Sequence, residues 1–302
     1  MNVFVAGASG TIGVPLVRAL VTAGHHVTAM TRSPEKQAML KDFGAVPVVA
    51  DALDADAVMR VVVASKPDVV IHQLTALPKA GVKKASDLDA TNRLRSEGTR
   101  YLLAAAIAAH ARRIIAGSFA LFRDGASTGD AGTDQAAAAV ASMEGQILDA
   151  SRRGAIEGVV LRYGLFYGPH NPATDQMITL VRRRMLPVVR GDKSLLPVIH
   201  IDDAVSATVA ALDRGPAGQV YDIVDDRPVS MTDIVVNLAE RAGAPKPFAV
   251  PAWIPRLLAP YLAQVTSLHL NLTNSAARAG LGWHPAFPTF REGVAQTLSN
   301  AA

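Results

Sequence analysis

Cysteine is absent from this chain of 302 residues, which excludes a disulfide framework, a thiolate metal site and a cysteine nucleophile. Charged residues are also scarce, at 19% of the chain, against a typical share of roughly 25%. Half of the residues are hydrophobic, so apolar side chains can offset the entropy cost of folding, and a disordered or fibrous chain is excluded. The net charge of +4 is compatible with anionic small molecules and too weak to argue for nucleic acid.

Targeting signals are missing as well. The amino-terminal segment lacks the basic region of a secretory signal peptide, and its apolar run is short. The longest uncharged stretch, 257–277, could span a bilayer by length, but it contains several polar side chains that hydrocarbon would penalise. We therefore predict a cytoplasmic protein with a small-molecule substrate, no membrane segment, no nucleic-acid partner and no metal site.

Short β-branched runs alternate with helical patterns through the first half of the chain. Such alternation predicts βαβ units, and hence an α/β fold with a Rossmann-type doubly wound parallel sheet whose strands are buried on both faces. The predicted strands are 3–6, 27–30, 46–49, 69–72, 114–116 and 159–161, and the predicted helices are 15–23, 55–64, 88–109 and 135–151.

After Gly168-Pro169, prolines and irregular stretches become frequent. Two regular elements interrupt them, a predicted helix at 203–212 with Asp202 as its N-cap and a predicted strand at 219–224. We assign 1–167 to a dinucleotide-binding domain, to which 200–224 return. A smaller, interleaved C-terminal substrate lobe then comprises 168–199 and 225–302.

A turn with glycines three residues apart joins the first predicted strand to the first predicted helix. The first glycine permits a tight turn, the second lets the backbone approach a pyrophosphate, and the third allows close packing of helix and strand. The helix N-terminus then presents unpaired N–H groups and a positive dipole end to the phosphates. Because a strand precedes the turn and a helix follows it, we interpret it as a dinucleotide site rather than an ordinary loop. The predicted cofactor-binding residues of the turn are Gly7, Ser9, Gly10, Thr11, Ile12 and Gly13.

With this turn, the chain resembles the extended short-chain dehydrogenase/reductase superfamily, in the branch of NAD-dependent epimerases and dehydratases. The resemblance covers essentially the whole chain. It implies that Asp51, after the third strand, contacts the adenine, and it suggests a homodimer through the helices around 94–110 and 135–151, with a monomer as the alternative. Matching patterns lie at 67–72, in the fourth strand, at 161–169, in the sixth strand and its loop, and at 198–204 and 280–285, in the substrate lobe.

The second strand ends without the carboxylate that binds the ribose hydroxyls in NAD-preferring Rossmann folds. Arg32 and Ser33 stand there instead. The arginine offers a forked set of donors to a 2′-phosphate, and the serine hydroxyl could add one more. A solvated surface arginine is the alternative, but this loop should border the adenosine pocket. We therefore predict NADP(H) as the cofactor.

The resemblance implies a catalytic Tyr-x-x-x-Lys pair on the helix after the fifth strand, and a serine or threonine at the end of that strand. The lysine lowers the pKa of the tyrosine, which exchanges a proton with the substrate oxygen while hydride moves. Ser118 stands at the serine position, but no tyrosine of the chain is followed four residues later by lysine. Alignment on Glu144 places Ala136 and Val140 at the positions of the pair.

Replacement proton donors are therefore sought near the crevice. Tyr163 and Tyr167 follow the sixth strand, whose carboxyl end faces the cofactor. We predict Ser118, Tyr163 and Tyr167 as catalytic residues, with packing or substrate contact as the other interpretation of each tyrosine.

Two leucines argue against nucleotide-sugar substrates, on which many members of the resembled family act. Leu165 and Leu196 stand where the resemblance implies an asparagine and an arginine that bind the diphosphate, whose charges would be left unpaired. The segment 251–258 could form an apolar wall over the crevice, with core packing as an equal alternative.

We therefore predict an NADP(H)-dependent oxidoreductase that transfers hydride to or from a small, apolar carbonyl, imine or enone, with Ser118 orienting the substrate and a tyrosine or water supplying the proton. The first alternative is a sugar-nucleotide epimerase or dehydratase. The second is a non-catalytic regulator that senses the dinucleotide.

Overall fold

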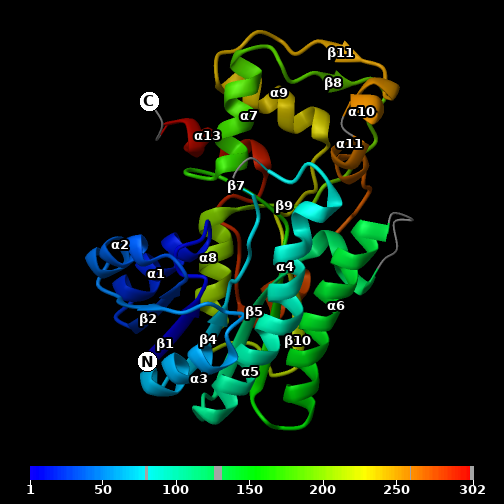
Figure 1. Cartoon of the computed structure of the whole chain (residues 1–302). Helices are drawn as coiled ribbons and strands as arrows, with labels where there is room; N and C mark the ends of the chain where they lie inside the picture. Colours follow the sequence, from blue (N-terminus) through cyan, green and yellow to red (C-terminus); the bar gives the residue numbers. More distant parts are fainter. Residues whose placement is uncertain (79–80, 126–130, 259, 300–302) are drawn as a thin grey trace.

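The computed structural model describes residues 1–78, 81–125, 131–258 and 260–299 (Figure 1). A seven-stranded sheet in the order β10-β6-β5-β4-β1-β2-β3 forms the lower part of the molecule in this view. Every pairing in the sheet is parallel, which confirms the predicted Rossmann-type fold. Its strands are β1 (Asn2–Ala6), β2 (His26–Thr31), β3 (Val46–Val49), β4 (Val69–His72), β5 (Arg113–Phe119), β6 (Glu157–Tyr163) and β10 (Gln219–Ile223).

The sheet has one switch point, between β1 and β4. The chain runs outward from β1 through β2 to β3, and then crosses back to β4, which pairs with β1 on its other side. Ligands of open α/β sheets bind outside the carboxyl ends of the strands at such a point. The topology therefore locates the site before any side chain is considered.

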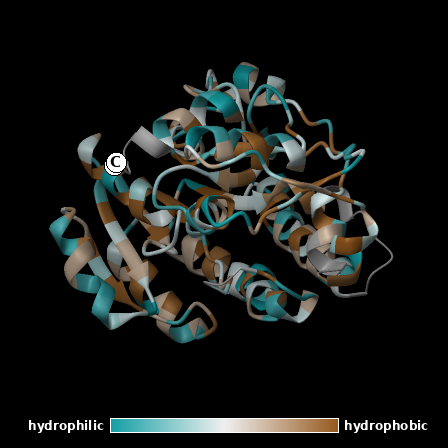
Figure 2. Ribbon diagram, turned by 90° about the horizontal axis from the view of Figure 1, so that it is seen from above, coloured by the Kyte–Doolittle hydropathy of each residue, from teal (hydrophilic) through white to brown (hydrophobic). Residues whose placement is uncertain are grey.

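Helices cover both faces of the sheet (Figure 1). Val3 and Val5 face a core formed with α1 (Gly13–Thr22), α8 (Ile201–Ala210) and α12 (Ser275–Leu281), and the alternate residues Phe4 and Ala6 face a second core. Hydrophobic and hydrophilic residues alternate along the covering helices, as amphipathic packing requires (Figure 2). The second face is covered by α3 (Ala55–Ser65), α5 (Thr99–Ala108) and α6 (Ala131–Arg152).

The helix expected at 88–109 is interrupted. It consists of α4 (Asp89–Arg93), a π-helical turn at Leu94–Gly98, and α5. Shorter elements beside the sheet are α2 (Gln37–Asp42) and the 3₁₀ turns Pro34–Lys36, Ala85–Leu88 and Ala120–Gly125.

Helix α8 begins two residues earlier than predicted, and the N-cap expected at Asp202 is wrong. The cap is His200, whose Nδ1 accepts the N–H of Asp202 at 3.3 Å. The carboxylate of Asp203 accepts the N–H groups of Ala286 and Phe287 at 2.7 and 2.9 Å. An imidazole nitrogen can accept a hydrogen bond as a carboxylate does, and here it occupies the cap position.

A second group of elements lies above the carboxyl ends of the strands in Figure 1. Its core contains Ile178, Val181, Leu196, Leu238 and Phe290. None of the helices in the described ranges combines the length and apolarity needed to cross a membrane. The domain boundaries drawn from the sequence stay a prediction. The elements are the paired strands β7 (Leu165–Tyr167) and β9 (Val198–His200), the paired strands β8 (Val188–Val189) and β11 (Ala249–Val250), and the helices α7 (Pro172–Arg182), α9 (Met231–Arg241), α10 (Trp253–Leu258), α11 (Pro260–Thr266) and α13 (Phe290–Ser299).

Candidate functional site

The glycine-rich turn after β1 has the shape that its sequence predicts. Gly7 adopts φ +88°, and a Cβ on it would stand 2.4 Å from the carbonyl oxygen of Gln73. A Cβ on Gly13 would lie 2.1 Å from the carbonyl oxygen of Gly7, so only glycine lets α1 start against the turn. Gly10 and Thr11 are exposed, and the first turn of α1 carries no acidic residue to neutralise the helix dipole. This cradle fits an anionic pyrophosphate.

The end of β2 is tied to this turn. The hydroxyls of Ser9 and Thr31 lie 2.8 Å apart, and the N–H of Ser33 donates to the Thr31 hydroxyl at 3.2 Å. Between them Arg32 is exposed, and within the described residues it forms no hydrogen bond or ion pair. Its guanidinium is therefore available to a ligand at this edge. The predicted roles of Ser9, Arg32 and Ser33 stay predictions.

Asp51 lies at the same edge, two residues after β3. Its side chain is exposed, and one carboxylate oxygen accepts the N–H of Leu53 at 2.9 Å. The other oxygen remains able to accept a hydrogen bond from an adenine amino group. Ile12, by contrast, is buried as the N-cap residue of α1, so it contributes backbone and packing rather than a polar side chain.

Ser118, the next-to-last residue of β5, lies in a buried ionic cluster. Its hydroxyl donates to Oε1 of Glu144 at 2.5 Å, and Glu144 also receives two hydrogen bonds from the Arg162 guanidinium, at 2.9 and 2.6 Å. All three residues are buried. The serine proton is thus directed toward Glu144 on α6, and only the oxygen lone pairs of Ser118 are left to accept a hydrogen bond.

Tyr163 ends β6 in a hydrogen-bonded chain. Its hydroxyl lies 2.7 Å from the hydroxyl of Thr208 and accepts Nε2–H of Gln73 at 3.0 Å. Burial raises the pKa of Tyr163 to about 12, which makes it a weaker acid than an ordinary tyrosine.

Tyr167 points into the upper group of elements. Its hydroxyl donates to Oδ2 of Asp225 at 2.9 Å, and a Cβ on Gly293 in α13 would stand 2.4 Å from the tyrosine oxygen. Burial, together with the charge of Asp225, raises the pKa of Tyr167. Burial also raises the pKa of Asp225 to about 8.

The three predicted catalytic hydroxyls are therefore not gathered around one point of the crevice. Each donates its proton to, or shares it with, an acceptor inside the protein. Ala136 and Val140, at the aligned positions of the Tyr-x-x-x-Lys pair, are fully buried in α6. This geometry does not favour either tyrosine as a proton donor, and their catalytic role stays a prediction.

Sequence reasoning missed Gln73, which follows β4 at the switch point. Its side chain is 8% exposed and lies against Gly117, because a Cβ on Gly117 would stand 2.2 Å from its Oε1. A glycine inside a strand often marks a close approach of another group. Gly117 in the fifth strand was such a signal, as was a polar residue directly after a buried strand.

The apolar residues of the upper elements fall into two groups. Leu196 is fully buried in the core, whereas Trp253, Leu257 and Leu258 on α10 are 63%, 72% and 78% exposed. The core-packing interpretation is therefore wrong for these three side chains. Their role as a wall over the crevice stays a prediction.

Comparisons with known proteins agree with this architecture. The model of the NAD dependent epimerase/dehydratase family matches residues 3–224. A 3-diazoavenalumate denitrifying reductase of Streptomyces sp is 37% identical, over 97% of this chain and 99% of that protein. A 4-hydroxy-2-methyl-3-oxo-4-farnesyl-3,4-dihydroquinoline-1-oxide ketoreductase of Stigmatella aurantiaca is 28% identical, over 80% of this chain and 74% of that protein. The crystal structure of a UDP-glucose 4-epimerase of Thermus thermophilus, in complex with NAD, superposes with a TM-score of 0.76 at 22% identity, over 99% and 98% of the two chains.

Proposed function

The chain belongs to the NAD dependent epimerase/dehydratase family, and from this premise we propose that it is an NADP(H)-dependent reductase of a small electrophile. The reductases among its relatives and the family model support an oxidoreductase with a nicotinamide dinucleotide cofactor. The preference for the 2′-phosphate and the class of substrate are our proposal.

The residues present fit such a cofactor. The cradle of Gly7, Gly10 and Gly13 would hold the pyrophosphate, and Asp51 would accept from the adenine. Arg32, which is exposed at the end of β2, would pair with a 2′-phosphate. When bound, the reduced nicotinamide supplies a hydride.

One observation supports the choice of substrate. The hydroxyl protons of all three predicted catalytic residues form hydrogen bonds within the protein. Reduction of a carbonyl creates an oxyanion and needs a proton donor beside it. Ser118, Tyr163 and Tyr167 instead have their protons shared with or donated to Glu144, Thr208 and Asp225. An electrophile that needs no proton fits this site better.

A diazonium group is such an electrophile. When its carbon gains a hydride, a C–H bond forms, the C–N bond breaks, and N₂ leaves with the bonding electron pair. The positive charge of the diazonium and the negative charge of the hydride cancel, so no proton is exchanged. The name of the Streptomyces relative describes a reduction of this kind, of a diazo compound with loss of nitrogen. We propose an aryl diazonium as the substrate class, oriented in part by the lone pairs of Ser118.

The test is a comparison of substrates with purified protein. We expect NADPH consumption and N₂ release with an aryl diazonium salt, faster with NADPH than with NADH and in proportion to the protein added. Protein-free samples and the Arg32→Ala variant are the controls for direct reduction in solution. Turnover of ketones or enones without turnover of the diazonium would overturn the substrate class and restore the carbonyl prediction. NADPH binding without turnover of any of these would favour the regulator.

A further inference from the structure

Gln73 occupies the strand end next to the glycine-rich turn. Its N–H donates to the carbonyl oxygen of Ala6 at 2.8 Å, and its own carbonyl is the group that a Cβ on Gly7 would meet. The backbone of Gln73 is therefore fixed at the switch point. Its side chain extends away from the turn, toward Gly117 on β5 and Tyr163 on β6.

A chain of hydrogen bonds fixes the orientation of the Gln73 amide. The hydroxyl of Thr208 donates to the carbonyl oxygen of Ala204 at 2.7 Å, within α8. A hydroxyl has one proton, so the Thr208 oxygen must accept from Tyr163 across their 2.7 Å contact. The Tyr163 oxygen then accepts Nε2–H of Gln73 at 3.0 Å. These hydrogen bonds require the amide nitrogen of Gln73 to face Tyr163. The amide oxygen of Gln73 therefore faces another direction.

The Gln73 oxygen is left free by this arrangement. Oε1 accepts no hydrogen bond from the residues that the structure describes. It is not fully buried either, so a ligand can reach it. It lies over β5 in the space that glycine at 117 leaves open. A buried polar side chain whose acceptor still reaches the surface is suited to bind a donor from a ligand.

We propose that Gln73 is a positioning residue that presents Oε1 to the carboxamide NH₂ of the nicotinamide. The adenosine half of a dinucleotide lies on the β2 and β3 side of the switch point, where Arg32 and Asp51 stand, so the nicotinamide half lies over β4, β5 and β6. The side chain of Gln73 extends to that side, and its free acceptor matches the donor of a carboxamide. The inference rests on the proposed function only in taking a nicotinamide dinucleotide as the cofactor.

The test compares ligands that differ in this one group. The 3-acetylpyridine analogue of NADP⁺ carries a methyl ketone in place of the carboxamide, and 2′-phospho-ADP-ribose has no nicotinamide ring. By calorimetry we expect the wild-type protein to bind NADP⁺ about five- to tenfold more tightly than the analogue, as for one hydrogen bond to a partly buried acceptor. Gln73→Leu should lose this discrimination and still bind 2′-phospho-ADP-ribose with wild-type affinity.

Two further variants separate the contact from a general structural effect. Gly117→Ala places a methyl group 2.2 Å from Oε1 of Gln73 and 2.9 Å from the ring of Tyr163, so it should displace the amide and remove the discrimination although the glutamine is still present. Tyr101→Phe removes a tyrosine hydroxyl that contacts only Arg100 among the described residues, outside this hydrogen-bonded network, and should preserve the discrimination. Discrimination that survives in Gln73→Leu, or an equal loss of affinity for NADP⁺ and 2′-phospho-ADP-ribose, would overturn the proposal.

Failure of the proposed function would look different. A wild-type protein that prefers NAD⁺ overturns the NADP assignment, and the same comparison is then made with NAD⁺ and its 3-acetylpyridine analogue. A wild-type protein that binds no dinucleotide overturns both proposals.

Discussion

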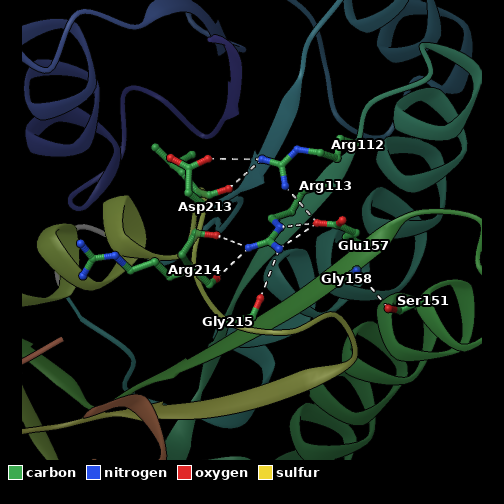
Figure 3. A network of polar contacts seen from close by, with 10 residues as sticks. Arg112, Arg113, Ser151, Glu157, Gly158, Asp213, Arg214 and Gly215 are labelled. Carbon is green, nitrogen blue, oxygen red and sulfur yellow. Dashed lines mark hydrogen bonds and ion pairs between the residues drawn. The ribbon is translucent and has the colours of Figure 1, made fainter. Parts of the chain in front are cut away.

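The two edges of the central sheet use arginine in opposite ways. At the amino edge, where β5 and β6 begin, Arg113 is 5% exposed and donates to Glu157 and to the carbonyl oxygens of Ala211, Arg214 and Gly215 (Figure 3). At the carboxyl edge, Arg32 is exposed and has no partner within the described residues. The same side chain therefore stabilises the protein at one edge and is available to a ligand at the other.

This difference indicates how structural and ligand-binding polar groups can be separated. Arg113 holds the end of α8 against the sheet, because it donates to the carbonyl oxygens that follow the helix (Figure 3). Its removal would leave those acceptors unpaired. Removal of Arg32 would leave no group of the protein unpaired, so its effect should appear only when a ligand binds.

The largest effect is expected at the amino edge. Arg113→Met should lower the free energy of unfolding by about 3 kcal/mol, because it leaves the carbonyl oxygens of Ala211, Arg214 and Gly215 without their donor. The matched control is Arg112→Met, which alters a side chain that is 43% exposed and should cost at most about 1 kcal/mol. Urea unfolding measures both values. Equal losses for the two variants would contradict the contrast between buried and exposed arginines.

The second effect is expected at the carboxyl edge. Arg32→Ala should weaken NADPH binding about ten- to a hundredfold, as for the loss of a charged hydrogen bond to the 2′-phosphate. Its affinity for NADH and its unfolding free energy should match those of the wild-type protein. Calorimetric titration with both dinucleotides is the measurement. Equal affinities of the wild-type protein for NADPH and NADH would remove the assignment.

The third effect concerns Asp225. Like Arg113, Asp225 is buried and has a hydrogen-bond partner inside the protein, since it accepts from Tyr167. Burial raises its pKa to about 8 in the folded protein, against about 3.9 in an unfolded chain, so folding favours the protonated form. The stabilisation is complete at low pH and is lost as the pH rises through 8. Between pH 6.5 and 8 the unfolding free energy should fall by roughly 1.5 kcal/mol from this group.

The pH window of this test is chosen to avoid His72, whose pKa is lowered to about 4 by burial and by nearby Arg95. His72 favours folding in its neutral form, so its contribution decreases only as the pH falls below about 6.5. The control is Asp225→Asn, which should show a flatter profile over the same window while NADPH affinity is retained. A profile for Asp225→Asn as steep as that of the wild-type protein would contradict this role.

The smallest effect is expected from the two tyrosines. Tyr163→Phe and Tyr167→Phe should each change kcat at saturating NADPH by less than about threefold, since positioned proton donors contribute roughly a hundredfold or more. Steady-state kinetics with the diazonium substrate test this. A hundredfold loss of kcat in either variant would identify that tyrosine as the proton donor. It would also show that a side chain hydrogen-bonded inside the protein can act on the substrate.

The sequence predicted the fold well because its signals are local. Continuous β-branched runs such as 69–72 identify strands buried on both faces, and β4 is fully buried. The glycine-rich turn was found for the same reason, because the residues that shape it lie within seven positions of one another.

The contacts of the site were harder to predict because their partners are distant in sequence. Gln73 and Tyr163 are 90 residues apart, and Tyr163 and Thr208 are 45 apart. The hydrogen-bonded chain that orients the amide exists only once β4, β6 and α8 have assembled. His200 as a helix cap was likewise missed, since histidine is not among the usual N-cap residues.

The most direct test of hydride transfer without a proton donor follows the hydrogen that reaches the product. An aryl diazonium is reduced in ordinary water with NADPH that carries deuterium at the transferred position, and the arene is analysed by mass spectrometry. Hydride transfer from the cofactor should place one deuterium at the carbon that lost N₂, in proportion to the protein added. The arene should contain no deuterium when unlabelled NADPH is used in D₂O. Deuterium taken from the solvent, or none taken from the cofactor, would contradict hydride transfer without a proton donor.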